Sequence, residues 1–195
     1  ATSFFPAKPL GCYGDGGALF TNEEHFYKIA YSSHLHGMGS KKYEYDRIGM
    51  NGRIDTIQAA ILLEKLKIFK SELNLRNEIA QQYKNKFLDL KTNIKLPTVI
   101  PDATSSWAQF TIQLPIKYDR TKFQTKMKEK NIPTAIYYPI PLHCQKPYKN
   151  FPISSDDLEN TNYLSKCVVS LPMHPYLSSE NINYISETVN EIIHN

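Results

Sequence analysis

The sequence predicts an α/β protein made of three consecutive parts. Three observations support this prediction: a glycine-rich segment between two short apolar runs at the start, a helical pattern of unusual length in the middle, and alternating strand and helix patterns in the second half. The parts are residues 1–55, residues 56–92 and residues 93–195. We expect the last part to form a small α/β domain that closes on the first.

The composition is that of an ordinary globular protein with a slight excess of positive charge. The chain has 195 residues, 23 of them basic and 19 acidic, for a net charge of +4. Four lysines share one predicted helix, but a glutamate interrupts them and no aromatic side chains are interleaved, so they indicate a solvated face rather than a nucleic-acid site. They are Lys122, Lys126, Lys128 and Lys130. A weakly basic surface favours an anionic ligand.

The three cysteines, Cys12, Cys144 and Cys167, have no C-x-x-C spacing and are odd in number. They predict neither a disulfide framework nor a zinc site, and a reducing compartment, the cytoplasm, is the natural setting. No apolar run approaches the length of a membrane span, so we expect no membrane association.

The first twenty residues place a lysine beside a glycine-rich turn. The apolar runs Ser3–Phe5 and Ala18–Phe20 predict two strands. The glycines between and at the edge of these runs indicate backbone that needs positive φ or a close approach; they are Gly11, Gly14, Gly16 and Gly17. Pro9 biases Lys8 toward an extended conformation. Desolvation of such a lysine lowers its pKa and frees the amine to attack a carbonyl, which is the chemistry of a Schiff base to pyridoxal phosphate (PLP). A solvated surface lysine is the alternative from composition alone.

A helix and a loop with two histidines follow. Asn22 is the expected N-cap of a helix from Glu23 to His34. His34 and His36 lie in a glycine-flanked loop without nearby cysteines or clustered carboxylates. Loop histidines near a polar site are therefore favoured over a metal pair.

Two polar side chains lie at the end of the first part. Asn51 offers an amide donor that suits a phosphate oxygen, and Arg53 offers a guanidinium that binds a carboxylate or phosphate through two hydrogen bonds. The alternative from spacing alone is a turn and helix cap with a structural Arg–Asp pair. A long helix then runs from Thr56 to about Leu90, because apolar side chains recur at a spacing of three to four. A helix of this length commonly links two domains.

The remaining residues alternate between strands and helices. The predicted strands are Trp107–Leu114, Thr134–Tyr137 and Cys167–Leu171, and the predicted helices are Arg120–Lys130, Asp156–Lys166 and Ser178–Ile193. A proline-rich loop after the second strand carries three side chains able to orient a ligand, namely Tyr137, Tyr138 and His143. The alternative is a polyproline-like loop on which these aromatic rings pack.

The segment from Ser3 to Ala18, Ser-Phe-Phe-Pro-Ala-Lys-Pro-Leu-Gly-Cys-Tyr-Gly-Asp-Gly-Gly-Ala, closely resembles the lysine segment of the DegT–StrS sugar-nucleotide aminotransferases. Within that group it is most similar to the enzymes that aminate a 3-keto UDP-sugar uronic acid. The resemblance implies that the chain is the C-terminal portion of a fold-type-I PLP-dependent transferase, with the end of the large domain, a long linking helix and an α/β small domain. It also implies that Lys8 carries PLP and that Ser3 bonds the PLP phosphate.

Two further segments extend the resemblance. The string Gly-Met-Asn-Gly-Arg that ends at Arg53 resembles the family's Gly-x-Asn-x-Arg segment. It implies that Asn51 reaches across a homodimer interface to the neighbour's PLP phosphate and that Arg53 points into the same shared site. The proline-rich loop resembles a His-Tyr-Pro-x-Pro-Leu-His loop, so Tyr137, Tyr138 and His143 are expected to bind substrate, with Tyr137 in a place where histidine is common.

The implied reaction is transamination of a nucleotide-linked keto-sugar, a UDP-sugar, with glutamate as amino donor. The product would serve the biosynthesis of a cell-surface polysaccharide such as lipopolysaccharide. Lys8, once released from the cofactor, would move a proton between the cofactor and the substrate carbon. Related dehydratases carry histidine in place of this lysine, so Lys8 disfavours that class.

The chain begins at Ala1 directly on a predicted strand, so we expect the C-terminal portion of a longer polypeptide that is inactive alone. The alternatives are a non-catalytic remnant and a subunit that needs a separate N-terminal chain. No motif supplies a carboxylate for the pyridinium nitrogen of PLP, and Asp15 is expected to cap the glycine-rich turn instead.

Overall fold

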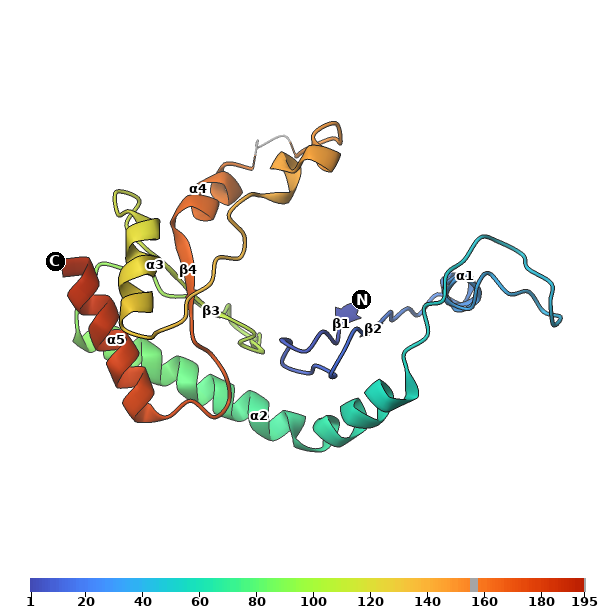
Figure 1. Ribbon diagram of the computed structural model, residues 1–195, viewed down its shortest axis with the longest axis horizontal. Coiled ribbons are helices and arrows are strands. Elements are labelled where there is room, and N and C mark those ends of the chain that lie inside the picture. Colours follow the sequence, from blue (N-terminus) through green and yellow to red (C-terminus); the bar gives the residue numbers. More distant parts are fainter. Residues whose placement is uncertain (155–157, 195) are drawn as a thin grey trace. The chain divides into compact units, whose positions relative to one another are not determined.

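A computed structural model describes residues 1–154 and 158–194 (Figure 1). The strands are β1 (Thr2–Ser3), β2 (Gly17–Ala18), β3 (Phe110–Gln113) and β4 (Val168–Leu171). The α-helices are α1 (Glu24–His34), α2 (Thr56–Asp89), α3 (Arg120–Glu129), α4 (Glu159–Cys167) and α5 (Ser179–His194), and two short 3-10 helices are η1 (Leu142–Cys144) and η2 (Lys146–Tyr148). The chain forms two units, Ala1–Lys70 (unit 1) and Ser71 onward (unit 2), whose boundary lies inside α2.

The hydrophobic core lies in unit 2. There β3 and β4 pair antiparallel, with Phe110 opposite Leu171 and Ile112 opposite Val169, and α3, α5 and the second half of α2 gather around this pair (Figure 1). The inward residues of β3 are fully buried, as expected for a strand with one face on the core. The apolar stripe of α5 completes the core; it consists of Ile182, Ile185, Val189 and Ile192.

Polar side chains of α2 attach the neighbouring loops of unit 2. Arg76 donates through Nη1 to the Trp107 carbonyl oxygen at 2.9 Å, and Asn77 Oδ1 accepts from Trp107 Nε1 at 2.8 Å. Tyr83 donates its hydroxyl to the Pro172 carbonyl oxygen at 3.0 Å. Burial lowers the pKa of Arg76, although the nearby Glu72 carboxylate raises it, and burial raises the pKa of Tyr83. The raised pKa favours the protonated form of the Tyr83 hydroxyl, which is the form that donates its bond.

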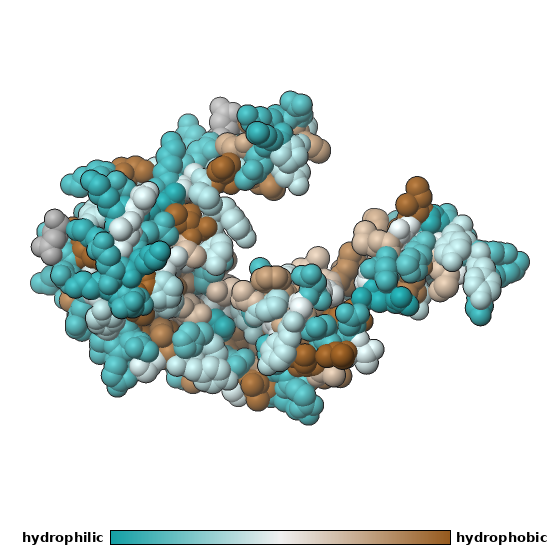
Figure 2. Space-filling model, in the orientation of Figure 1, coloured by the Kyte–Doolittle hydropathy of each residue, from teal (hydrophilic) through white to brown (hydrophobic). Residues whose placement is uncertain are grey.

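Unit 1 buries few apolar side chains. Among its hydrophobic residues only Cys12 and Leu62 are buried in the described structure, whereas Phe20 is 72% exposed and Ile48 is 99% exposed. Figure 2 shows apolar side chains among the hydrophilic ones on the surface of the region that carries α1. Strands β1 and β2 pair over only two residues each, Thr2 with Ala18 and Ser3 with Gly17. Burial of apolar side chains therefore contributes little to the stability of unit 1.

Most helices were predicted correctly from sequence. The α1, α2, α3 and α5 predictions are confirmed to within one residue at each end. Ser178 caps α5, since its Oγ accepts from Asn181 N–H at 3.2 Å. The predicted N-cap Asn22 is wrong, because the cap position is Glu23, whose N–H is bound by Thr21 Oγ1. The predicted helix Asp156–Lys166 corresponds to α4 from Glu159 on, and its first residues lie outside the described residues.

The predicted strands were too long. Phe4 and Phe5 lie outside β1: the Phe4 N–H still bonds to the Gly16 carbonyl oxygen across the ladder, but the Phe4 carbonyl oxygen accepts from Cys12 N–H instead of from the facing strand. Residues Leu19 and Phe20 lie beyond β2. Strand β3 begins only at Phe110, since Trp107 adopts a left-handed φ of 45°.

The segment predicted as strand Thr134–Tyr137 contains a single bridge, from Ala135 to Ser170. Prolines at 133 and 139 flank this segment and cannot donate to a ladder, which limits the pairing. None of the helices in the described residues has both the length and the apolar character needed to cross a membrane.

Candidate active site

Lys8 lies on an exposed turn within the segment that joins β1 to β2. Its N–H donates to the Phe5 carbonyl oxygen at 2.9 Å, which closes a four-residue turn, and Pro9 follows. The side chain is exposed, so the desolvation expected from sequence is not provided by these residues alone. No carboxylate lies within ion-pairing distance of the Lys8 amine in the part of the chain that the structure describes. The amine is thus available to a ligand.

Ser3 and Asn51 both use an acceptor atom within the chain, and no described residue takes their donors. Ser3 Oγ accepts from Phe5 N–H at 3.2 Å, which leaves its own O–H to donate. Asn51 Oδ1 accepts from Arg53 Nε at 3.2 Å, which leaves the amide NH₂ group to donate. Both residues are exposed. Free donors of this kind suit the oxygens of a phosphate.

Arg53 has no acidic partner among the described residues. The structural Arg–Asp pair that was the alternative from spacing is therefore not formed. With Nε on Asn51, the terminal guanidinium nitrogens remain free to bind an anion.

The loop that carries Asn51 is held against the end of α1. Leu35 bridges to Asn51, and Gly52 N–H donates to the His34 carbonyl oxygen at 2.8 Å. The close approach depends on two glycines. A Cβ at Gly37 would overlap the Arg47 carbonyl oxygen, and one at Gly49 would overlap the backbone of residues 36 and 37.

The two predicted loop histidines make backbone contacts. His34 Nδ1 lies 3.3 Å from the Ala30 carbonyl oxygen, and the N–H of His36 donates to the Met50 carbonyl oxygen at 2.9 Å. Among the described residues, no three His, Cys, Asp or Glu side chains are grouped so that they could hold a metal ion.

The glycine-rich turn is not capped by Asp15, contrary to the prediction. Asp15 is exposed and accepts no hydrogen bond from the turn in the described structure. Other groups already take the turn's N–H donors: Cys12 N–H bonds to the Phe4 carbonyl oxygen at 2.8 Å, and Tyr13 N–H bonds to Gln58 Oε1 at 2.8 Å.

A groove of about 810 Å³ in unit 1 adjoins the end of the lysine segment, at Gly17 and Ala18, and the segment that carries Asn51. It is lined by β2 and the residues after it, by one face of α1, and by Met50 and Gly52. Tyr27 and Tyr31 contribute aromatic walls, with ring centroids 5.7 Å apart. This groove was not predicted from the sequence, although two tyrosines four residues apart on a helix were a visible signal.

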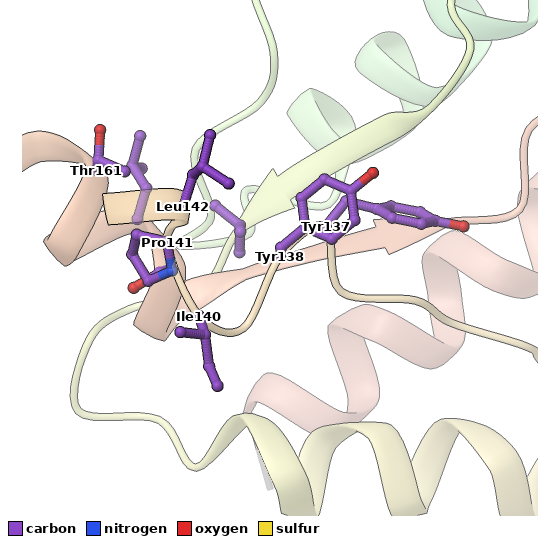
Figure 3. A pocket seen from close by; sticks show the side chains of 9 residues that line it. Tyr137, Tyr138, Ile140, Pro141, Leu142 and Thr161 are labelled. Carbon is purple, nitrogen blue, oxygen red and sulfur yellow. The ribbon is translucent and has the colours of Figure 1, made fainter. Parts of the chain in front are cut away.

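Tyr137 and Tyr138 line a separate hollow of about 280 Å³ in unit 2 (Figure 3). Their rings are edge to face with centroids 5.6 Å apart, and Pro141 and Thr161 lie toward the other end. Neither tyrosine hydroxyl has a hydrogen-bond partner among the described residues, and both side chains are exposed. They can therefore stack on or donate to a ligand.

His143 is not brought into this hollow. It lies on η1, half-buried, with Nε2 3.0 Å from Asn162 Oδ1 of α4. The three residues expected to bind substrate thus separate into an adjacent tyrosine pair and a histidine that is held by the chain itself.

Comparison with known proteins identifies similar chains. Residues 1–190 match the family model of the DegT/DnrJ/EryC1/StrS aminotransferases. The chain is 42% identical over 188 residues to the UDP-2-acetamido-2-deoxy-3-oxo-D-glucuronate aminotransferase of Pseudomonas aeruginosa, which covers 94% of this chain and 49% of that protein.

Solved structures give the same result. A DegT DnrJ EryC1 StrS aminotransferase from Brucella abortus superposes with a TM-score of 0.90 at 40% identity, over 100% of this chain and 50% of that chain. DesV from S. venezuelae, in complex with a ketimine intermediate, superposes with a TM-score of 0.87 at 28% identity, over 99% of this chain and 51% of that chain. The predicted α/β portion of a fold-type-I transferase is confirmed, and the chain spans about half the length of these relatives.

Proposed function

The chain belongs to the DegT/DnrJ/EryC1/StrS aminotransferase family, and from this premise we propose that it takes part in the PLP-dependent transfer of an amino group to a nucleotide-linked keto-sugar. The observation that carries the proposal is Lys8, an exposed amine at a glycine-rich turn that has no carboxylate partner among the described residues and lies five residues after the Ser3 hydroxyl.

The residues present fit PLP. An amine suits its aldehyde, and the free donors of Ser3 and Asn51 suit its phosphate. The turn needs glycine, because a Cβ at Gly11 would lie 2.6 Å from the Phe5 carbonyl oxygen. PLP, when bound, supplies an electrophilic carbonyl and an electron sink for the reacting carbon.

The side chains have separate roles in this proposal. Lys8 Nζ holds the cofactor covalently and, as a free amine, takes up and returns a proton at the reacting carbon. Ser3 bonds the phosphate from the same subunit, and Asn51 bonds it from the neighbouring subunit of a homodimer with shared sites. Arg53 binds an anionic group of the substrate through its free guanidinium edge. Tyr137 and Tyr138 orient the substrate, and His143 supports their loop through Asn162.

We infer that the substrate is a UDP-sugar and that glutamate is the amino donor. The similar P. aeruginosa protein carries a UDP-linked 3-oxo-glucuronate in its name, which supports the first inference. A product of this kind would serve a cell-surface polysaccharide such as lipopolysaccharide. The number and spacing of the cysteines support the cytoplasm as the compartment.

A subunit that works only beside a second polypeptide, or a non-catalytic remnant, is the other candidate. The small number of buried apolar side chains in unit 1 favours it over a self-sufficient enzyme.

Borohydride trapping tests the assignment of Lys8. In the full-length polypeptide or complex that holds PLP, reduction should fix the cofactor to the peptide that contains Lys8, and Lys8→Ala should abolish the link. Lys8→Arg should not restore it, because a guanidinium stays protonated and is no amine nucleophile. Trapping at another lysine of the wild-type protein would overturn the proposal. A lack of PLP absorbance in every assembly would favour the non-catalytic candidate.

A further inference from the structure

The loop that carries Lys8 is closed by its own backbone. Phe4 N–H donates to the Gly16 carbonyl oxygen at 2.8 Å, and Cys12 N–H donates to the Phe4 carbonyl oxygen at 2.8 Å. Lys8 lies in the middle of the loop and Gly11 near its end. These bonds join the two ends of the loop to each other. They do not attach the loop to the rest of unit 1.

Two side chains of α2 supply that attachment. Gln58 Oε1 accepts from Tyr13 N–H at 2.8 Å, and Lys65 Nζ donates to the Gly11 carbonyl oxygen at 2.6 Å. The Lys65 ammonium also lies 5.1 Å from the centroid of the Tyr13 ring. Gln58 and Lys65 are two helical turns apart and project from one face of α2.

Lys65 differs from its neighbour Lys67 in how it uses its charge. Lys67 is exposed and pairs with Glu64 at 2.7 Å, a contact that contributes little to stability. Lys65 is half-buried and has no carboxylate within ion-pairing distance among the described residues. Its charge is directed instead at a backbone carbonyl and an aromatic face, and hydrogen bonds from a charged donor are stronger than neutral ones.

The glycines of the turn permit this approach. A Cβ at Gly14 would lie 2.8 Å from Gln58 Nε2. A side chain there would displace Gln58 and with it the bond to Tyr13. Glycine at position 14 therefore allows Gln58 to approach the turn closely enough to bond to Tyr13.

We propose that Gln58 and Lys65 are positioning residues for Lys8. By holding Tyr13 and Gly11 against α2, they fix the loop that presents the Lys8 amine. This inference rests on the proposed function of Lys8. Small displacements of a reacting group reduce turnover strongly, so an effect on rate without an effect on substrate affinity is expected.

The reactivity of the cysteines provides a readout that does not involve the cofactor. Cys12 is fully buried within the turn, with Sγ 3.0 Å from the Phe4 carbonyl oxygen. Cys144 is exposed and Cys167 is buried in unit 2, so the same chain contains a fast and a slow reference. Labelling with a small aromatic disulfide, followed by peptide mass mapping, measures each thiol separately.

Lys65→Ala and Gln58→Ala should each increase the labelling rate of Cys12 about tenfold or more, with Cys144 and Cys167 unchanged. Lys67→Ala is the matched control and should leave Cys12 protected. Lys65→Arg keeps a charged donor and Gln58→Glu keeps an acceptor oxygen, so both should retain most of the protection.

In the assembly that holds PLP, Lys65→Ala should lower kcat about 10- to 100-fold with little change in KM for the sugar, and Lys65→Arg should restore most of it. Unchanged Cys12 labelling together with unchanged kcat in both alanine variants would overturn the inference even if trapping occurs at Lys8. Trapping at another lysine would overturn the proposed function and leave the Cys12 result standing as a structural one. If Lys65→Ala does not fold, Gln58→Ala and Lys65→Arg decide the same question.

Discussion

Replacement of Phe110 tests where the stability of this chain resides. Phe110 is fully buried, and its ring centroid is 4.7 Å from that of Tyr83 and 5.8 Å from that of Trp107. Removing a buried phenyl ring and leaving a cavity costs about 3–5 kcal/mol. Each aromatic contact at such distances stabilises the fold by about 0.5–1.5 kcal/mol beyond the contribution of the buried surface area. We therefore expect Phe110→Ala to lower the free energy of unfolding by an amount in the upper part of that range, about 4–5 kcal/mol.

The measurement is urea unfolding followed by the fluorescence of Trp107, the only tryptophan of the chain, which lies in unit 2. Phe20→Ala is the matched control in unit 1, because it makes the same chemical change at a ring that is 72% exposed. It should change the free energy measured through Trp107 by less than about 0.5 kcal/mol. A loss below about 1 kcal/mol for Phe110→Ala, or equal losses for the two variants, would refute the reasoning.

Three further predictions concern function and pH. Mixing full-length chains that carry Lys8→Ala with chains that carry Arg53→Ala should restore part of the transaminase activity, because one intact site can form if the two residues come from different subunits; proven heterodimers without activity would place both residues in one subunit's site. The 195-residue chain alone should show no transamination and bind PLP weakly, and measurable turnover by the purified chain would contradict this. The hydrogen bond from Tyr176 to Glu72 raises the pKa of Tyr176, so its stabilising contribution is present below the ordinary tyrosine pKa of about 10 and is lost as the pH rises through the raised value. Stability of Tyr176→Phe should accordingly fall less steeply than that of wild type over this alkaline range, and parallel curves would argue against the bond.

Sequence periodicity predicted the helices well because their apolar stripes and caps are local. The bounds of α2 were predicted within one residue from a spacing of three to four, and those of α5 were also predicted within one residue. Strand ends were predicted poorly, since alternation continues past the last ladder bond. The left-handed backbone of Trp107, stabilised by the bond from Arg76 to its carbonyl, has no signal in the local pattern.

The two strands on either side of Lys8 were predictable from the local pattern of apolar residues and glycines, although their ends were not. The separation of His143 from Tyr138 could not be predicted, because the His143 ring contacts Asn162, which is distant in sequence and lies on α4. The attachment of the glycine-rich turn by Gln58 was also invisible, since the two partners are 45 residues apart.

The hydrogen-bonding of the arginines separates structural from ligand-binding groups. Arg76 and Arg120 both donate to backbone carbonyl oxygens of unit 2, Arg76 to Trp107 at 2.9 Å and Arg120 to Ser165 at 2.6 Å, so their charges already serve the fold. Among the described residues, Arg53 donates only to the exposed side chain of Asn51, two residues away. A guanidinium that is neither paired nor used to hold a loop costs nothing to the fold when it binds an external anion. This contrast supports the proposal that Arg53 serves a ligand, whereas Arg76 and Arg120 belong to the packed unit 2 from which Tyr137 and Tyr138 project.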